Sequence, residues 1–180
     1  MIVLGIDPGL ANTGYGLIDT APRPGARAPS TIAAVALGVI ETAPGQPIER
    51  RLAQLHDALE SVVREYSPDT LALEELYFGQ NARSAFAVGQ ARGVALLVAG
   101  RNGLACAGYT PQQVKGAVCG HGRAGKDQVA RMVAALLGLP GQPRPDHATD
   151  ALAVAICHAN RAPLEFALQR ARPAGVGSLA

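Results

Sequence analysis

The sequence predicts an α/β protein in which helices flank a mixed β-sheet. Short apolar segments that have the character of strands gather near the N-terminus, at residues 2–7, 13–19 and 31–41. Further along the chain, segments with helical spacing alternate with short apolar runs. Strands first, followed by alternating helices and strands, are typical of a sandwich of helices and a mixed sheet. The pattern does not give the order of the strands.

Each element follows from its local residues. Residues 2–7 predict a buried strand because they are short and apolar and are ended by Pro8-Gly9. The Pro/Gly/Ala-rich stretch before residue 31 predicts a loop. Residues 47–65 predict a helix, since apolar residues recur there at steps of three and four. Strands are also predicted at 70–75 and 103–107, and helices at 82–100, from Thr110-Pro111, at 125–138 and at 146–161.

The length and composition indicate one domain. The chain has 180 residues, of which 48% are hydrophobic, and this is enough for a single core. We assign the domain to residues 1–162 and expect residues 163–180 to be a disordered tail. We also expect no membrane association, because no apolar run is long enough to span a bilayer and the N-terminus lacks the features of a signal peptide.

The three cysteines indicate a reducing compartment. Cys106, Cys119 and Cys157 are odd in number and widely spaced, which argues against a disulfide framework or a zinc site. We expect each of them to be a small buried apolar residue in a cytoplasmic protein.

The charge is unevenly distributed along the chain. The formal net charge is only +2. Residues 76–144, however, contain eight basic residues and one acidic residue, a net charge of +7, whereas the other eight basic and thirteen acidic residues give −5. Such asymmetry favours a polyanionic partner, although a solvated surface is the ordinary explanation of a basic stretch.

Four polar residues lie at the edges of apolar segments. Asp7 ends the run IVLGID, Glu74 ends LALE, and His147 and Asp150 begin the stretch HATDALAVAICHA. A charge beside a core is costly unless it is paired or holds a metal. Converging carboxylates cannot pair with one another, whereas Mg²⁺ and Mn²⁺ prefer oxygen ligands.

Each of these residues also has a plain structural interpretation. Asp7 fits a turn, since Asp-Pro-Gly favours one. Strand alternation sends Glu74 and Glu75 to opposite faces, and periodicity does not decide which of them shares a site with Asp7. His147 and Asp150 share a helical face at i and i+3, while Asp146 fits an N-cap after Pro145.

The two lysines of the chain lie in the basic segment. Fourteen of the sixteen basic residues are arginines, and only Lys115 and Lys126, near the glycine-rich segment GHGRAG, are lysines. A lysine presents a compact point charge to phosphate, unlike the planar fork of arginine. This signal is weak by itself, because chance can also explain it.

Five motifs together resemble the RuvC family of bacterial Holliday-junction resolvases. They are GIDPGLANTGYG, LALEELYF, NARSAFAVGQARGVAL, QVKGAVCGHGRAGKDQV and PDHATDALAVAICHA. They occur in the order of the family and cover residues 1–160. The DPG element alone is a weak signal, whereas all five at these spacings are specific.

The resemblance implies a ribonuclease-H-like fold with a five-stranded mixed sheet flanked by helices. It implies a homodimer, formed through the helix near residues 82–100, that binds four-way DNA junctions. The activity it implies is a pair of symmetric nicks in strands of like polarity, by two-metal hydrolysis with Mg²⁺ or Mn²⁺ that leaves 5′-phosphate ends. It also implies recombination and repair in the bacterial cytoplasm, in association with the nucleoid and a RuvA–RuvB branch-migration complex.

The resemblance also implies roles for particular residues. The catalytic and metal-binding set is Asp7, Glu74, His147 and Asp150, which favours Glu74 over Glu75. Lys115 and Lys126 match basic positions that serve both DNA binding and catalysis. The other DNA contacts expected are Tyr77, Phe78, Arg83 and Arg123.

His147 departs from those family members that carry Asp at this position. Imidazole is a softer ligand than carboxylate, so we expect strong activity with Mn²⁺. Alternatively, His147 could act as a proton shuttle, because histidine titrates near neutral pH. Three other functions remain as alternatives: an actin-like phosphotransferase, which normally has two such lobes, a non-catalytic junction scaffold, and a nuclease for RNA–DNA hybrids.

Overall fold

The structure is a computed structural model that describes residues 1–21, 32–75 and 82–171, with the backbone alone for 82–84 and 162–171. Within these ranges, five strands form one mixed sheet in the order β3-β2-β1-β4-β5. The strands are β1 (Ile2–Asp7), β2 (Asn12–Asp19), β3 (Ala33–Glu41), β4 (Thr70–Glu74) and β5 (Ala105–Tyr109). Strands β1, β2 and β3 are antiparallel, whereas β4 runs parallel to β1 and β5 runs parallel to β4. The predicted five-stranded mixed sheet is therefore confirmed, and the structure supplies its order.

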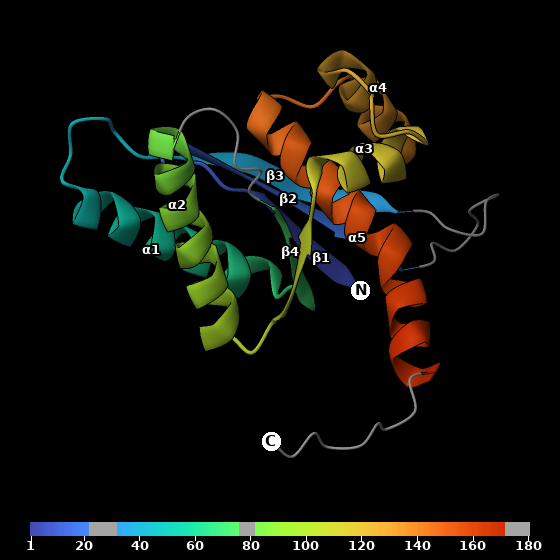
Figure 1. Ribbon diagram of the computed structural model, residues 1–180, viewed down its shortest axis with the longest axis horizontal. Helices are drawn as coiled ribbons and strands as arrows, with labels where there is room; N and C mark the ends of the chain where they lie inside the picture. The colour runs from blue at the N-terminus through green and yellow to red at the C-terminus, as the bar shows by residue number, and fades with distance from the viewer. Residues whose placement is uncertain (22–31, 76–81, 172–180) are drawn as a thin grey trace.

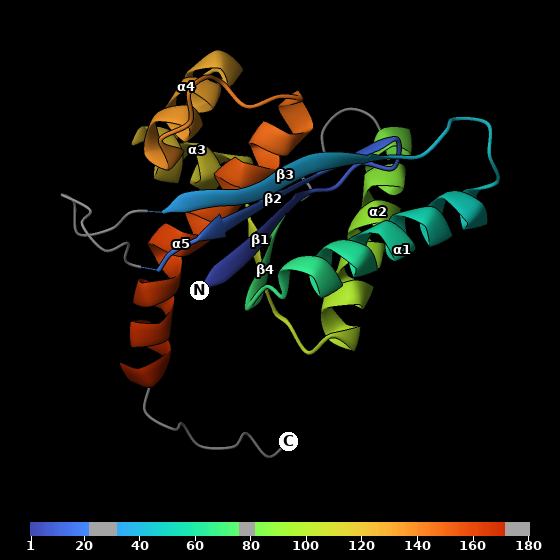
Figure 2. The same cartoon turned by 180° about the vertical axis from the view of Figure 1, so that it is seen from behind.

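Helices cover both faces of this sheet. They are α1 (Ile48–Tyr66), α2 (Ala82–Arg101), α3 (Pro111–Cys119), α4 (Lys126–Leu137) and α5 (Asp146–Ala171). Helix α5 crosses one face together with α3 and α4, while α1 and α2 lie on the other (Figures 1 and 2). The protein therefore has three layers, with the sheet in the middle.

Strand alternation divides the core into two clusters. On the α5 side, Val3 and Ile18 pack with Leu152 of α5. On the other side, Leu4 packs in a cluster with Leu59 of α1. Successive residues of a strand point to opposite faces, so one strand contributes to both clusters. The same alternation determines which side of the sheet receives the side chain at the end of each strand.

Helix α5 lies unusually close to the sheet because glycines lie beneath it. A Cβ atom added at Gly5 would overlap the backbone of Ala151, and one added at Gly14 would overlap the backbone of His147. Gly14 pairs with Asp7 in the antiparallel ladder. The absence of side chains at these positions allows the start of α5 to approach the end of β1.

Most elements lie within two residues of their predicted bounds, and β5 and α5 show how the structure departs from the prediction. Strand β5 begins at Ala105 rather than at 103, because Gly103 takes a positive φ and the amide of Leu104 still donates to Ala99 at the end of α2. Helix α5 continues to Ala171 instead of ending at 161. Most of the residues in 164–171 are good helix formers, which favours continuation of the helix beyond Pro163. The domain bounds 1–162 and the disordered tail 163–180 stay predictions, and 172–180 lie outside the described residues.

The cysteine prediction holds only in part. Cys157 is buried, but Cys106 is exposed on β5, which is an edge strand of the sheet. In the described part of the chain, no helix is both long enough and apolar enough to cross a membrane.

Candidate functional site

Asp7 and Glu74 lie side by side at one edge of the sheet. Strands β1 and β4 are parallel neighbours, and the pairing of Ile6 with Leu73 brings their last residues together. The carboxyl ends of parallel strands are common positions for binding sites. Asp7 shares the face of Gly5, which lies under α5, and Glu74 shares the face of Ala72, which belongs to the α5-side cluster. The structure thus places Glu74, and not the exposed Glu75, on the side of Asp7.

Helix α5 brings His147 and Asp150 to the same place. The Nδ1 atom of His147 lies 2.7 Å from Oδ2 of Asp7 and, when protonated, donates a hydrogen bond to it. The other ring nitrogen, Nε2, is then the one that can serve as a ligand. Asp146 is the first residue of the helix rather than the residue that caps it.

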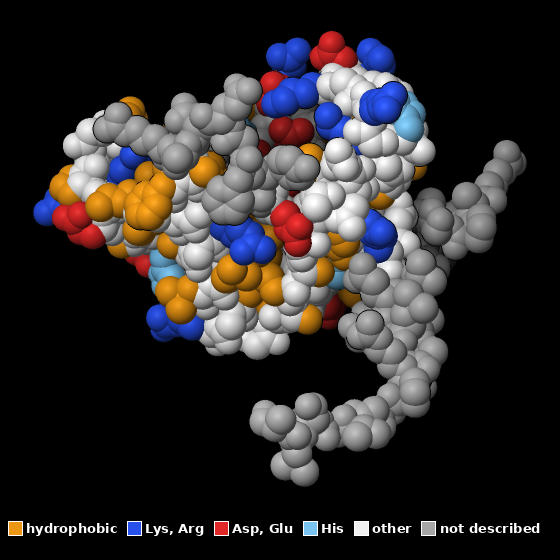
Figure 3. Space-filling model, viewed as in Figure 1, with side chains coloured by type: hydrophobic (Ala, Val, Ile, Leu, Met, Phe, Trp, Pro, Cys, Tyr) orange, Lys and Arg blue, Asp and Glu red, His pale blue; other side chains and the backbone are white. Residues whose placement is uncertain are grey.

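All four predicted residues line one cavity with a volume of about 340 Å³, together with both lysines of the chain. Lys115 comes from α3 and Lys126 from the start of α4. The Nζ atom of Lys126 lies 3.7 Å from Oδ2 of Asp150. In Figure 3, acidic side chains lie in a recess near the top of the view, with basic side chains around it.

The carboxylates of the cavity repel one another. Burial, followed by the negative charges of Asp7 and Asp150, raises the pKa of Glu74 to about 7, and the positive charge of Lys126 opposes this shift. Burial and the charge of Asp7 also raise the pKa of Asp150, while Lys126 and His147 lower it. Two carboxyl groups with raised pKa values beside a third acid are typical of a functional site.

The donor set has the chemistry of a divalent metal site. Three carboxylates and one imidazole suit Mg²⁺ or Mn²⁺, and a cation between them would relieve the repulsion that raises the pKa of Glu74. Among the described residues, however, no three His, Cys, Asp or Glu side chains are placed to hold a metal ion as they stand. His147 is bonded to Asp7, and Lys126 is paired with Asp150. Metal binding would therefore have to rearrange these side chains.

Of the remaining predicted DNA contacts, only Arg123 has a described side chain, and it does not line the cavity. Arg123 is exposed on the loop between α3 and α4. Arg83 belongs to the first turn of α2, where only the backbone is described. Tyr77 and Phe78 lie outside the described residues.

Sequence reasoning missed the apolar wall of the cavity. Val114 and Val129 are buried, and they line it together with Pro111 and Ala153. Val129 lies three residues after Lys126 and Ala153 lies three residues after Asp150, so each shares a helical face with a predicted residue. Helical spacing counted from the polar residues would have found them.

Comparison with known proteins identifies the family. The family model described as "Crossover junction endodeoxyribonuclease RuvC" matches residues 3–158. The chain belongs to the RuvC family. The RuvC protein of Moorella thermoacetica is 52% identical over 163 residues, which is 91% of this chain and 93% of that protein.

Solved RuvC structures share the whole fold. The Thermus thermophilus RuvC structure has a TM-score of 0.82 and 36% identity, and the match covers 92% of this chain and 97% of that one. T. thermophilus RuvC in complex with a Holliday junction substrate has a TM-score of 0.81 and 33% identity, over 91% and 96% of the two chains. The ribonuclease-H-like architecture expected from the RuvC resemblance is therefore confirmed.

Proposed function

We propose that this chain resolves four-way DNA junctions by metal-dependent hydrolysis of phosphodiester bonds, with paired nicks in strands of like polarity. One observation carries the proposal. Three carboxylates and an imidazole, which come from β1, β4 and α5, line one cavity with both lysines of the chain. Its relatives are named crossover junction endodeoxyribonucleases, and one neighbouring structure holds a Holliday junction substrate.

The proposed ligands are Asp7, Glu74, His147 and Asp150, with Asp7 central to the set. When bound, two Mg²⁺ or Mn²⁺ ions supply activation of a water molecule and stabilisation of the charge on the leaving oxygen. Asp7 contacts both the imidazole of His147 and the carboxyl of Glu74, which supports a role for Asp7 in both halves of the site. The histidine favours Mn²⁺ as a cofactor that supports strong activity.

The lysines of the cavity would act on the DNA. Lys126 already partly offsets the charge of Asp150 and can offset the charge of a phosphate in the same way. Lys115 faces the cavity from α3. Together with Arg123, and with Arg83, Tyr77 and Phe78 as further expected contacts, they would hold the DNA backbone, so binding should weaken steeply with salt.

A homodimer is the proposed assembly, because paired nicks need two active sites. The candidate interface is α2, where Phe86 is 70% exposed and Leu97 is 53% exposed. Figure 3 shows hydrophobic side chains gathered over this side of the molecule. A two-fold axis would pair the same surface of both copies. The family resemblance adds the RuvA–RuvB complex as a partner and the bacterial nucleoid in the cytoplasm as the location.

The test compares a synthetic mobile four-way junction with a linear duplex of the same sequence, in Mg²⁺, in Mn²⁺ and in a chelator. We expect paired symmetric nicks in the junction alone and only when a metal is present. Cleavage of both DNAs at similar rates would contradict junction selectivity. Tight junction binding without cleavage in either metal would contradict the nuclease and favour a scaffold.

A further inference from the structure

The buried pair Tyr109–His158 lies on two elements next to the active-site cavity but does not line the cavity. The hydroxyl of Tyr109 lies 2.8 Å from Nδ1 of His158, and the two rings meet edge to face with centroids 5.8 Å apart. Both side chains are buried, at 2% and 7% exposure. Tyr109 belongs to the apolar cluster between the sheet and α5, as do the chain neighbours of His158, Cys157 and Ala159. A buried polar pair in apolar surroundings favours one particular packing over others that apolar contacts would also allow.

Tyr109 contacts the end of β4, the strand that carries Glu74 into the cavity. It is the register partner of Glu74 in the parallel ladder, and its carbonyl accepts a 2.8 Å hydrogen bond from the amide of Glu75. The next residue, Thr110, caps α3 through a reciprocal pair of hydrogen bonds with Gln113. Tyr109 thus joins the end of β4 to the helix that carries Lys115.

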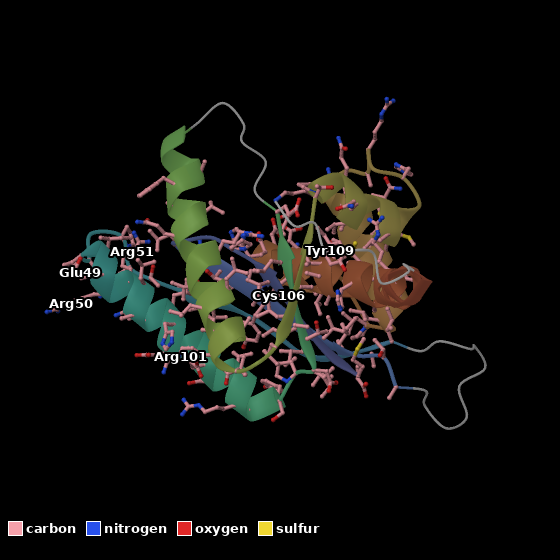
Figure 4. All side chains as sticks on the ribbon, turned by 60° about the horizontal axis from the view of Figure 1, so that its bottom comes forward. Glu49, Arg50, Arg51, Arg101, Cys106 and Tyr109 are labelled. Carbon is pink, nitrogen blue, oxygen red and sulfur yellow. The ribbon has the colours of Figure 1, made fainter. Side chains whose placement is uncertain are left out.

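His158 belongs to α5, the helix that supplies His147 and Asp150 to the cavity. It lies on α5 eight residues after Asp150, which is about two helical turns. The position of α5 along the sheet determines where Asp150 and His147 lie relative to Glu74. Strand β5 is an edge strand and has a ladder partner on one side only, so a side-chain anchor to α5 constrains it more than it would constrain a central strand. Figure 4 shows Tyr109 at the end of β5 that is near α3 and α5, with Cys106 further back along the strand.

We infer that Tyr109 and His158 are positioning residues that set the spacing between Glu74 and Asp150 and thereby tighten the binding of the divalent cation. The inference rests on the metal site of the proposed function. The pair touches neither the substrate nor the metal. It acts through the backbone of β4 and β5 on one side and through the helix α5 on the other.

The experiment measures Mn²⁺ binding to the intact protein by calorimetry, without DNA. Tyr109→Phe removes only the hydroxyl, and His158→Leu removes the ring nitrogens. Groups beyond the ligands typically alter metal affinity by ten- to a hundredfold, and these residues are one step further away, so we expect an increase in the Mn²⁺ dissociation constant of about three- to tenfold in each variant. His158→Asn keeps a hydrogen-bonding atom near the position of Nδ1 and should stay within about twofold of wild type. Junction binding in a chelator should be unchanged.

Val63→Ala is the matched control for a general loss of stability. Val63 is 6% exposed and lies in the cluster on the other face of the sheet, so its truncation lowers stability without touching the pair. Mn²⁺ affinity equal to wild type in Tyr109→Phe would overturn the inference. A loss of affinity as large in Val63→Ala would overturn it as well.

Asp7→Asn separates this inference from the proposed function. If Asp7→Asn leaves Mn²⁺ binding intact, the proposed metal site itself is wrong. If Asp7→Asn abolishes binding while Tyr109→Phe does not weaken it, only the positioning role is wrong. If His158→Leu does not fold, Tyr109→Phe decides the result alone.

Discussion

Glu74 and Glu75 are adjacent residues with opposite surroundings. Glu74 lines the cavity and has a raised pKa, whereas Glu75 is exposed and lies beside Gly108. We expect Glu74→Gln to lower the rate of junction cleavage by about 10³-fold, because a catalytic metal ion contributes several kcal/mol to the barrier. Glu75→Gln is the matched control and should cleave at nearly the wild-type rate. Single-turnover cleavage measures both, and similar losses in the two variants would contradict the assignment.

The raised pKa of Glu74 makes stability depend on pH when no metal is present. The pKa of its carboxyl is about 7 in the folded protein, against an ordinary value of 4.5. The folded state therefore binds this proton more tightly than the unfolded state, and the resulting stabilisation is complete below about pH 4.5 and is lost as pH rises through about 7.

Glu74→Gln should remove the loss of stability that wild type shows as pH rises. In a chelator at pH 8, the free energy of unfolding of the variant should exceed that of wild type by roughly 3 kcal/mol at most, and the difference should vanish near pH 4. Denaturant unfolding across this pH range provides the measurement. The explanation fails if the two proteins lose the same stability between pH 5 and pH 8.

At the scale of elements, the close approach of α5 to the sheet depends on glycine. Gly14 lies beneath the backbone of His147 and pairs with Asp7. Gly14→Ala should lower stability by about 3 kcal/mol or more, because the methyl group would overlap backbone that cannot move independently of the helix. It should also reduce cleavage, since His147 would shift away from Asp7.

Gly116→Ala is the control for this substitution. Gly116 lies inside α3, and a Cβ atom there meets nothing within 4 Å. Alanine in a helix interior is favoured over glycine by about 0.5–1 kcal/mol, so this variant should be as stable as wild type or more stable. Thermal unfolding of the two variants compares them directly, and equal melting temperatures would argue against the packing role of Gly14.

The sequence predicted the elements well where local pattern alone determines them. Strand β1 was predicted with its bounds, because an apolar run ended by Pro-Gly has one local solution. The strand order came only from the structure, since the pairing of β1 with β4 joins residues far apart in the sequence, such as Val3 and Thr70. The choice between Glu74 and Glu75 likewise needed the sheet faces, because alternation separates the two residues without saying which face lies under α5.

The sequence predicted the polar residues of the cavity but not the contacts between them. The four polar residues stand out because charges beside apolar runs are costly. The contact between Asp7 and His147 joins residues 140 positions apart, and so does not follow from local spacing. The Tyr109–His158 pair carried no signal, since a tyrosine and a histidine in apolar segments are ordinary core residues.

At the scale of the whole molecule, the proposed dimer predicts that a charge on the surface of α2 prevents dimerisation. Leu97→Glu places a charge in the exposed apolar surface of α2 and should dissociate the dimer, because a buried unpaired charge is costly. Sedimentation should then show a monomer at concentrations where wild type is a dimer, and junction cleavage should lose its paired nicks. Leu136→Glu on α4, at a leucine that is 39% exposed, is the control and should leave the assembly unchanged. An unchanged sedimentation coefficient in Leu97→Glu would place the interface elsewhere.

We propose that Asp7 organises a metal-dependent active site that cuts DNA junctions. The most direct measurement follows binding and cleavage of one synthetic four-way junction by wild type, by Asp7→Asn and by Asp57→Asn, whose carboxylate is 81% exposed on α1. We predict that Asp7→Asn binds the junction with nearly wild-type affinity but does not cleave it in Mg²⁺ or Mn²⁺, while Asp57→Asn binds and cleaves normally. Junction cleavage by Asp7→Asn at a rate near that of wild type would contradict the account.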